Sequence, residues 1–401
     1  MMNRQRRTSV CREGWCYLLL LAFVFAWAIL REANLLLIVA GLMCGPIVCS
    51  WRLARRTLRD VQVRRTAPRA VYAGEPLAVE IELRSARDRR GSWALWVTDH
   101  VRREDDVPGN GSQKPATLFS YVPAGGTRRR AYHGRFFERG RYRLGPLEVS
   151  TRFPFGLLRG TITPDQEETH ALTVFPRLGR LTPAWKARHR EALQGARGGR
   201  RPGRAPGAFC GVREWQAGDS VRRVHWRSTA RHGEVVVCQF EQPRSRDVAV
   251  LLDLWQPGEP GVEDLENLEL AVSFAATLVA EVCRRGGGRL LLGITGAEPD
   301  LTTGSPSAPL VEHAMERLAV AKGSEEDHLP GLLDAALRQI KPGTEVVLVS
   351  PRRGPLSDML RTAPAGTDPL PEPAGSEIRL VSPADPGFSQ YFQPEPAVSS
   401  E

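Results

Sequence analysis

The stretch that decides the fold spans residues 208–255 and reads AFCGVREWQAGDSVRRVHWRSTARHGEVVVCQFEQPRSRDVAVLLDLW. It contains a Gly218-Asp219 turn, a basic and aromatic run over 222–227, a strand over 234–240 and a strand over 248–254 that is apolar except for Asp253. Such an apolar strand is typical of a parallel sheet that is covered on both faces. A charged and aromatic segment therefore leads into the first strand of an α/β domain.

Strands and helices alternate after this stretch. Apolar residues recur at helical spacing over 264–285. Further helices are expected over 308–320, 331–340 and 356–361, and further strands over 289–294, 345–350 and 377–381. The alternation predicts a mostly parallel sheet with helices on its faces over 248–383. Residues 384–401 are predicted to be a disordered tail.

Two uncharged apolar runs, residues 15–30 and 33–51, lie near the N-terminus. Each is close to the ~20 residues that a spanning helix needs. Arginines flank the pair on both sides, at positions 4, 6, 7 and 12 and at positions 52, 55, 56, 59, 64 and 65, whereas the connection has only Arg31 beside Glu32. The positive-inside rule then places both ends in the cytoplasm.

We therefore expect residues 1–60 to form a transmembrane hairpin in the inner (cytoplasmic) membrane of a bacterium, as a multi-pass anchor with both termini cytoplasmic. The lipid bilayer is the expected partner of this hairpin. The alternative is a cleaved signal peptide, because Ala26-Trp27-Ala28 resembles a cleavage site.

Residues 61–176 carry many short runs that alternate apolar and polar residues, most clearly over 77–83. This period predicts an all-β, sandwich-like domain. The run Phe153-Pro154-Phe155-Gly156-Leu157-Leu158 could be a hydrophobic binding loop. A buried corner is the favoured interpretation, because apolar residues are mostly core. Residues 177–207 include a Gly-, Arg- and Pro-rich part and are expected to be a flexible basic linker to the signature segment over 208–247.

The formal net charge is +10, and it favours an anionic partner. Nucleic acid is not expected, because Trp185 is the one aromatic residue in the basic linker and nucleic-acid patches interleave aromatic with basic residues. Anionic lipid is the better-placed partner. The seven cysteines form no CxxC pair, which suits a reducing compartment.

The sequence has no GxSxG elbow, phosphate-binding loop, HExxH or GxGxxG after a strand, so we expect no enzymatic activity and no cofactor. Cys210, His225, His232 and Cys238 are suitable metal-ligand types, but their spacings of 15, 7 and 6 residues match no paired-ligand pattern. Asp253 ends a buried parallel strand, where ligands bind in open α/β sheets. The alternative function is thus a metal-dependent receptor or hydrolase that uses Asp253 with the His/Cys set.

The central stretch resembles, in order and spacing, the signature of the domain of unknown function 58 (DUF58) family. The matching residues are Gly211, Arg213, Glu214, Trp215, Gly218, Asp219, Arg222, Arg223, His225, Trp226 and Arg231. The resemblance implies a membrane hairpin, a β domain and a von Willebrand factor A-like α/β domain. It also implies an accessory or scaffold protein of envelope assembly or protein maturation, whose partners are a MoxR-type AAA+ ATPase and a transglutaminase-like membrane protein.

The chain departs from that family in two places. His225 stands where the family usually has an acidic residue. A metal-ion-dependent adhesion site needs Asp-x-Ser-x-Ser, whereas Asp253-Leu254-Trp255-Gln256-Pro257 lacks both hydroxyl ligands. No carboxylate follows in Val349-Ser350-Pro351-Arg352 either. Because a hard divalent cation needs several oxygen ligands, we expect the fold without the metal, with Asp253 as a weak candidate ligand.

Two roles are open for the signature residues. Ion pairs of Arg213 with Glu214, and of Asp219 with Arg222 or Arg223, could dock the linker and the β domain on the α/β sheet, with Trp215 and Trp226 as apolar wedges. Alternatively, the same residues form an exposed contact for a partner, since Trp and Arg are enriched in interface hot spots.

Overall fold

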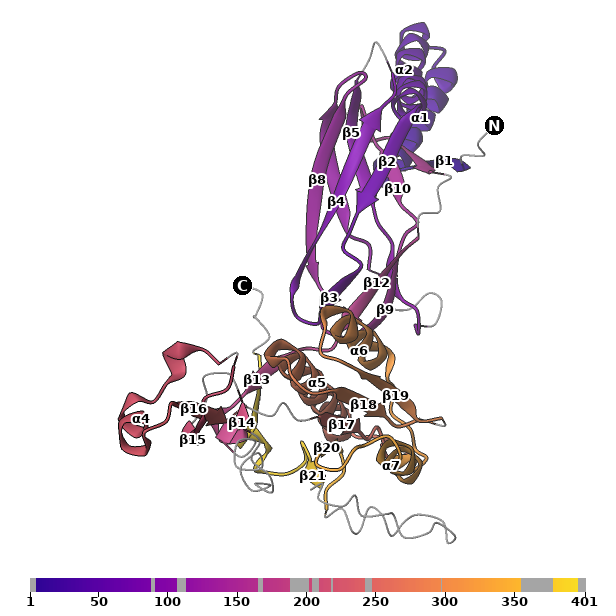
Figure 1. The fold of residues 1–401 in the computed structure, drawn as a ribbon. Coiled ribbons are helices and arrows are strands. Elements are labelled where there is room, and N and C mark those ends of the chain that lie inside the picture. The colour runs from indigo at the N-terminus through magenta and orange to yellow at the C-terminus, as the bar shows by residue number, and fades with distance from the viewer. Residues whose placement is uncertain are drawn as a thin grey trace. The chain divides into compact units, whose positions relative to one another are not determined.

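The computed structural model describes residues 5–87, 91–106, 113–164, 169–187, 202–203, 209–217, 219–241, 247–296, 298–354 and 378–395. The chain divides into two compact units, Met1–Phe175 and Pro176–Glu401. Figure 1 labels most of the helices and strands of both units.

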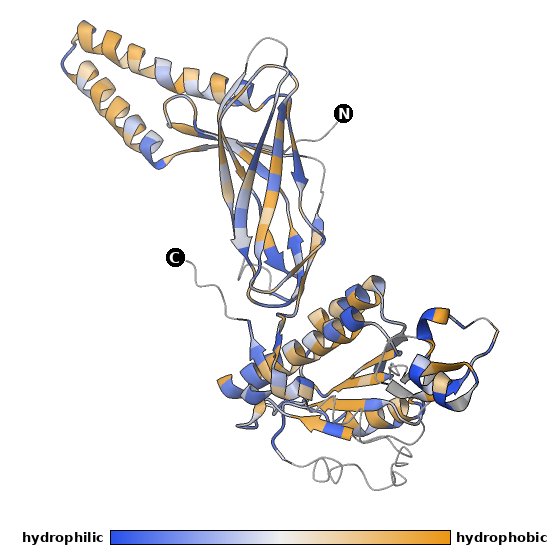
Figure 2. Cartoon of the chain, turned by 60° about the vertical axis from the view of Figure 1, so that its left-hand side comes forward, coloured by the Kyte–Doolittle hydropathy of each residue, from blue (hydrophilic) through white to orange (hydrophobic). Residues whose placement is uncertain are grey.

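Two apolar helices, α1 (Arg12–Leu30) and α2 (Asn34–Thr57), lie near the N-terminus of the first unit. Both are long and apolar enough to cross a membrane, by length and composition. Hydrophobic residues run along both of them (Figure 2), and their side chains are largely exposed, as at Phe23 (64%) and Leu42 (72%). The prediction of two apolar N-terminal helices is thus confirmed.

Three sheets form the β domain that follows. The first has the order β1 (Gln5–Val10), β11 (Leu158–Thr163), β10 (Glu148–Thr151), β5 (Ser92–Thr98) and β7 (Ala116–Val122). The second has the order β3 (Ala70–Tyr72), β12 (His170–Phe175), β9 (Gly140–Leu144) and β6 (Val101–Arg103). The third joins β2 (Val61–Thr66), β4 (Pro76–Ser85) and β8 (Thr127–Arg135).

Alternate residues of β4 build the core of this domain. Leu77, Val79, Ile81 and Leu83 are at most 3% exposed, as their period of two predicts. The domain also buries an ion pair, in which the Arg65 guanidinium lies 2.9 Å from an Asp99 carboxylate oxygen. Tyr132 donates its hydroxyl hydrogen to the same carboxylate at 2.8 Å, so the buried charges are hydrogen-bonded.

The sequence did not predict strand β1, which precedes the helical hairpin and pairs antiparallel with β11 from Gln5↔Thr163 to Val10↔Leu158. The Cys11 N–H, at the start of α1, donates to the Leu157 carbonyl at 2.9 Å. The last turn of α2 lies on β11, because a Cβ at Gly160 would come within 2.9 Å of Leu58. Both ends of the hairpin are therefore joined to the β domain.

A five-stranded sheet forms the centre of the second unit. Its order is β19 (Asp300–Gly304), β18 (Leu290–Ile294), β17 (Val248–Leu252), β20 (Glu345–Val349) and β21 (Ile378–Val381). All neighbours are parallel except β18 and β19, so the sheet is mixed. Counted along the chain from β17, the order is 3-2-1-4-5, which is the order of doubly wound α/β folds.

Helices α5 (Val262–Arg285), α6 (Ala308–Val320) and α7 (Leu329–Leu337) accompany this sheet. Helix α7 packs Leu329, Leu332 and Leu333 against Ala249 and Leu251 of β17. Helix α5 contacts β17, β18 and β20, and its residues from Ala271 to Val279 are all buried. The predicted helix over 356–361 lies outside the described residues.

The C-terminal segment corrects the prediction of a disordered tail over 384–401. Helical turn η2 (Phe388–Gln390) and strand β22 (Phe392–Pro394) lie within it, and β22 pairs with β13 (Gly179–Leu181), inside the predicted linker. Phe392 is 1% exposed, and its ring centre lies 5.5 Å from that of Phe274 on α5. Trp185 is 4% exposed and lies 5.3 Å from the same ring. Aromatic burial therefore holds both segments on the α/β unit.

Candidate functional site

The signature residues lie on a three-stranded sheet with the order β14 (Pro202–Gly203), β16 (Val236–Glu241) and β15 (Phe209–Glu214), and on the connection from β15 to β16. The connection includes the helical turn η1 (Val221–Arg223) and helix α4 (Trp226–His232). Two backbone hydrogen bonds fasten it to the sheet, from the Trp215 N–H to the Val235 carbonyl (2.8 Å) and from the His225 N–H to the Val236 carbonyl (2.9 Å). Gly218 lies outside the described residues.

A bidentate ion pair closes the turn after β15. Two nitrogens of Arg213 each lie 2.6 Å from an oxygen of Asp219. The Gln216 N–H donates to the same carboxylate at 2.9 Å. Bidentate pairs of this kind are both strong and geometrically specific. The predicted pairing of Arg213 with Glu214 is wrong, because the turn brings the guanidinium to Asp219 and to the backbone carbonyl of Glu214.

His225 caps helix α4. Its Nδ1 accepts a hydrogen bond from the Ser228 N–H at 3.2 Å and lies 2.8 Å from the Ser228 hydroxyl oxygen. Gly233 ends the helix with a φ of +76°. Aspartate is a preferred residue at the start of a helix, because its carboxylate accepts a hydrogen bond from a free backbone N–H in the same way. The imidazole thus supplies the acceptor that an acidic side chain would supply at this position.

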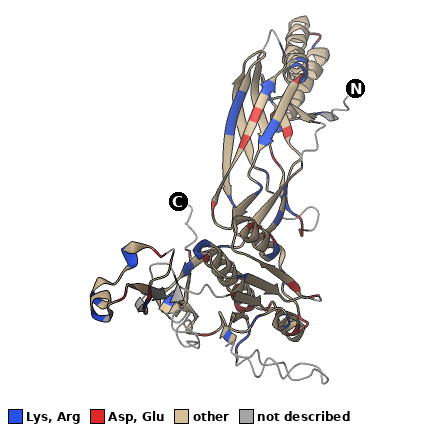
Figure 3. Cartoon of the chain, in the orientation of Figure 1, with Lys and Arg blue, Asp and Glu red and all other residues tan. Residues whose placement is uncertain are grey.

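The connection carries exposed apolar and basic side chains. Trp215 is 42% exposed, Val221 65% and Trp226 64%. Arg222, Arg227 and Arg231 are exposed as well, and Figure 3 shows basic residues along α4. Both tryptophans therefore expose much of their side chains on the unit Pro176–Glu401. We call residues 215–217 and 219–231 the exposed segment.

The predicted metal-ligand set is not brought together among the described side chains. His225 is the helix cap, Cys238 is half-buried on β16, and the side chains of Cys210 and His232 lie outside the described part of the chain. The described residues contain no group of three His, Cys, Asp or Glu side chains that could hold a metal ion.

Asp253 lies at the carboxyl edge of the five-stranded sheet. It follows β17, while Ser350 and Arg352 follow the parallel neighbour β20. The chain order of the sheet reverses between these two strands, and ligands of open α/β sheets bind at such a switch point. The Asp253 carboxylate is buried and accepts hydrogen bonds from the Ser350 hydroxyl at 2.8 Å and from the Trp255 N–H at 3.2 Å.

The guanidinium of Arg352 occupies this edge of the sheet. Its Nε donates to Asp253 at 2.9 Å, and its two terminal nitrogens donate to Asp327 at 2.8 and 2.7 Å. The Trp255 ring lies 4.9 Å from the guanidinium carbon, in a cation–π contact. We call Asp253, Asp327, Ser350 and Arg352 the switch-point network.

Backbone pairing explains why Asp327 reaches this site. Leu254 and Gln256, just after β17, each share a backbone hydrogen bond of 2.9 Å with Ser324. These bonds hold the chain before α7 beside the carboxyl end of β17. The sequence analysis missed Asp327 and gave Arg352 no role. The sequence did contain a signal for Arg352, because this residue follows the predicted strand over 345–350. The carboxyl ends of parallel strands meet at one edge of a sheet, and Asp253 lies at that edge.

The ionisation of the two carboxyls is shifted in opposite directions. Burial raises the pKa of Asp253, and the Arg352 charge and the Ser350 hydroxyl oppose this shift. Hydrogen bonds from Arg352 lower the pKa of Asp327, which is less buried. A hard divalent cation does not fit this arrangement, because a guanidinium already lies between the two carboxylates that would have to bind the cation.

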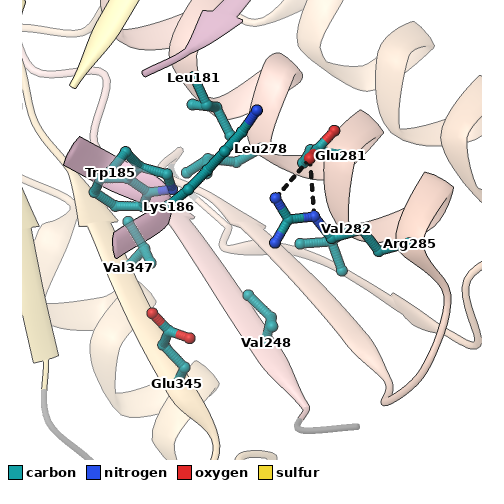
Figure 4. A pocket seen from close by; sticks show the side chains of 10 residues that line it. All are labelled: Leu181, Trp185, Lys186, Val248, Leu278, Glu281, Val282, Arg285, Glu345 and Val347. Carbon is teal, nitrogen blue, oxygen red and sulfur yellow. Dashed lines mark hydrogen bonds and ion pairs between the residues drawn. The ribbon is translucent and has the colours of Figure 1, made fainter. Parts of the chain in front are cut away.

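Two pockets lie at the amino end of the same sheet. One is a cavity of about 30 Å³ between Trp185, Val248, Leu278 and Glu345 (Figure 4). That volume holds about one water molecule. The other has about 250 Å³ beside Asp247 and Arg289, which is below the ~300 Å³ at which ligand pockets begin. The lining of neither pocket includes Asp253.

Comparison with known proteins finds a relative that is described as uncharacterized. The "Uncharacterized protein YeaD" of Bacillus subtilis (strain 168) is 23% identical over 320 residues, which are 77% of this chain and 75% of that protein.

Among solved structures, the CARDB domain of PF1109 from Pyrococcus furiosus has a TM-score of 0.17 and 13% identity, and it covers 29% of this chain and 90% of its own. The sporulation control protein Spo0M of Bacillus subtilis has a TM-score of 0.19 and 10% identity, over 36% of this chain and 58% of its own.

The family model described as "Protein of unknown function DUF58" matches residues 211–361. This range begins on β15 and ends after β20, so it holds both the exposed segment and the switch-point network. The part of this chain that carries its candidate sites is therefore the part that matches the DUF58 family.

Proposed function

We propose that this chain is a membrane-anchored accessory protein that presents a von Willebrand factor A-like α/β domain to a protein partner. The exposed segment is the contact surface. The observation that carries this proposal is the exposure of Trp215 and Trp226 among arginines on a connection that the Arg213–Asp219 pair holds in shape. Exposed tryptophan and arginine on a rigid support have the composition of an interface hot spot.

The apolar surfaces of α1 and α2 support the anchoring. Both helices expose long aliphatic and aromatic side chains along their length, which water would not favour. Because β1 and β2 on either side of the hairpin belong to the β domain, both ends of a spanning hairpin would be on one side of the membrane. The arginines beside the hairpin make that side the cytoplasm. The proposed location is thus the inner membrane, with both termini cytoplasmic.

The α/β unit supports a binding role. Its strand order is that of doubly wound α/β domains, which hold ligands at the carboxyl edge of the sheet. In this chain, Arg352 fills that edge. The resemblance to the DUF58 family implies a MoxR-type AAA+ ATPase as the partner, and a transglutaminase-like membrane protein as a further component. The scaffold would couple the ATPase to envelope assembly or protein maturation.

Quantitative co-purification from native membranes tests this proposal. The wild-type chain should enrich an AAA+ ATPase, and a Trp215→Ala/Trp226→Ala variant should lose this enrichment several-fold. Trp96→Ala is the matched control, because Trp96 lies on the β domain and is 41% exposed, like Trp215. Equal enrichment by all three chains would exclude the exposed segment as the contact. Absence of an ATPase from the wild-type sample would exclude the partner.

A further inference from the structure

Aromatic side chains are exposed at the end of the β domain that carries the helical hairpin. Trp93 on β5 is 50% exposed, Tyr121 on β7 is 40% exposed, and Phe155 in the loop between β10 and β11 is 56% exposed. The Trp93 ring lies 4.4 Å from that of Tyr121 and 6.5 Å from that of Phe153. The rings of Trp93, Tyr121 and Phe153 form a cluster, and Phe155 follows Phe153 by two residues. Exposed apolar patches of this kind mark sites of interaction with a partner or a membrane.

The Phe155 loop differs from the sequence-based interpretation as a buried corner. Leu157 and Leu158 are buried (8% and 9% exposed), as that interpretation required. Gly156 turns the chain with a φ of +70° just after Phe155. The Phe155 ring therefore stays outside while the two leucines enter the core.

The cluster lies next to the helices. The Ser92 hydroxyl, beside Trp93, donates to the carbonyl of Thr57 at the end of α2 at 3.1 Å. On the other side, the Leu157 carbonyl accepts from Cys11 at the start of α1, two residues away from Phe155. The aromatic side chains thus follow directly on the apolar surface of the hairpin.

Exposed arginines surround the same place. They are Arg12 at the start of α1, Arg52, Arg55 and Arg56 in the last turns of α2, and Arg152 beside the Phe155 loop. The Arg55 guanidinium carbon lies 4.7 Å from the ring centre of Trp51. The exposed acids on these segments are Glu13 and Asp60, so positive charge prevails. Tryptophan, tyrosine and arginine together are the residues of a membrane–water interface.

We propose that this end of the β domain is itself a membrane-binding collar that contacts the anionic headgroup layer of the bilayer. Trp93, Tyr121 and Phe155 insert at the level of the glycerol backbone, and the arginines bind lipid phosphates. The proposal rests on the membrane anchoring proposed above. The collar fixes the β domain against the bilayer surface, so that the hairpin does not act as a loose tether.

Photolabelling of the unaltered full chain tests the collar. The chain is reconstituted in vesicles of phosphatidylcholine with phosphatidylglycerol that contain a phospholipid with a diazirine near its glycerol backbone. After illumination and trypsin digestion, lipid adducts are quantified on three peptides that arginines delimit in the sequence, residues 32–52, 136–139 and 153–159. The first peptide includes most of α2, and the third includes Phe155.

The second peptide is the matched control. Phe137 is 64% exposed, which is similar to Phe155. It lies between β8 and β9, and Figure 1 shows β9 at the end of the β domain away from the hairpin. We expect several-fold more adduct on residues 153–159 than on residues 136–139. Phe155→Ser should reduce the adduct on the peptide that contains Trp93, while Phe137→Ser should not.

The outcomes separate the collar from the anchor. No adduct on residues 32–52 would overturn the membrane anchoring and the collar with it. Adduct on residues 32–52, with equal low labelling of the other two peptides, would overturn the collar alone. Labelling of residues 153–159 should also rise with the phosphatidylglycerol content and fall with added salt. Equal labelling in neutral and anionic vesicles would overturn the assignment of the arginines to lipid phosphates.

Discussion

At the scale of single residues, Arg352 has the largest set of partners at the candidate site. It joins Asp253 after β17 to Asp327 before α7, and its side chain is 11% exposed. A buried ion pair contributes little net stability compared with apolar residues of the same size, but the loss of one partner leaves an uncompensated buried charge. The network therefore makes the carboxyl edge of the sheet sensitive to substitution of this single residue.

Arg352→Ala should lower the free energy of unfolding of the C-terminal unit by about 3–5 kcal/mol, because Asp253 would remain buried without its cation. Urea denaturation of the detergent-solubilised chain measures this loss. Arg353→Ala is the control, since the neighbouring pair of Arg353 with Glu263 is mostly exposed (68% and 72%) and should cost at most about 1 kcal/mol. Similar losses in both variants would contradict the role of the network.

Asp327 makes a pH-dependent contribution to stability. Its pKa in the folded chain is lowered, so the stabilisation is complete above the unfolded pKa of about 3.9 and disappears as the pH falls through the folded value. The melting temperature of Asp327→Asn should thus be lower than that of the wild type at pH 7. The difference should begin to shrink as the pH falls below about 4, the unfolded pKa, and should vanish below the lowered folded pKa. A difference that is constant with pH would indicate lost packing. The raised pKa of Asp253 makes its contribution to stability change with pH in the opposite direction. That contribution cancels in the comparison, because Asp253 is present in both chains.

At the scale of elements, strand β1 makes the N-terminal segment part of the β domain. This strand is an edge of the five-stranded sheet of the β domain, and it pairs with β11 over six residues. Its removal would leave β11 as an unpaired edge, which promotes association with other chains. Removal of the N-terminal segment as a signal peptide would take strand β1 away from this sheet.

The intact chain isolated from membranes should therefore retain its N-terminal residues through Ala28. Intact-mass measurement after detergent extraction, supported by N-terminal peptide mapping, checks this expectation. Processing at Ala26-Trp27-Ala28 would shorten the chain and remove β1 and most of α1. Detection of that shortened chain as the main species would contradict both the hairpin and the β1–β11 pairing.

At the scale of the whole molecule, the surfaces proposed above for a protein partner and for lipid lie in different units. The exposed segment lies in the unit Pro176–Glu401, and the collar lies in the unit Met1–Phe175. The sheet edge at which α/β domains hold ligands is filled by an arginine. The guanidinium supplies the positive charge that a metal ion would otherwise supply at this edge. The stability of the α/β unit would therefore not depend on the concentration of divalent ions.

Metal removal should therefore leave the molecule unchanged. We expect the melting temperature of the wild-type chain to be the same with Mg²⁺ and with EDTA, because Arg352 supplies the positive charge between Asp253 and Asp327. Thermal melts and metal analysis of the purified chain measure this. Stoichiometric metal bound with micromolar affinity, or a melt that shifts with EDTA, would contradict the expectation.

The sequence alone determined the two apolar helices, the alternating strands of the β domain and the helices on the α/β sheet, because hydrophobic periodicity is a local property of the chain. The tertiary structure decided which distant residues meet: β1 with β11, the C-terminal phenylalanines with α5, and Arg352 with Asp253, which is 99 positions away. It also decided that Trp215, Trp226 and Phe155 face outward. Periodicity shows that a segment has an apolar face. Only the packing of the other segments determines whether a given side chain on it is covered and which charge lies beside it.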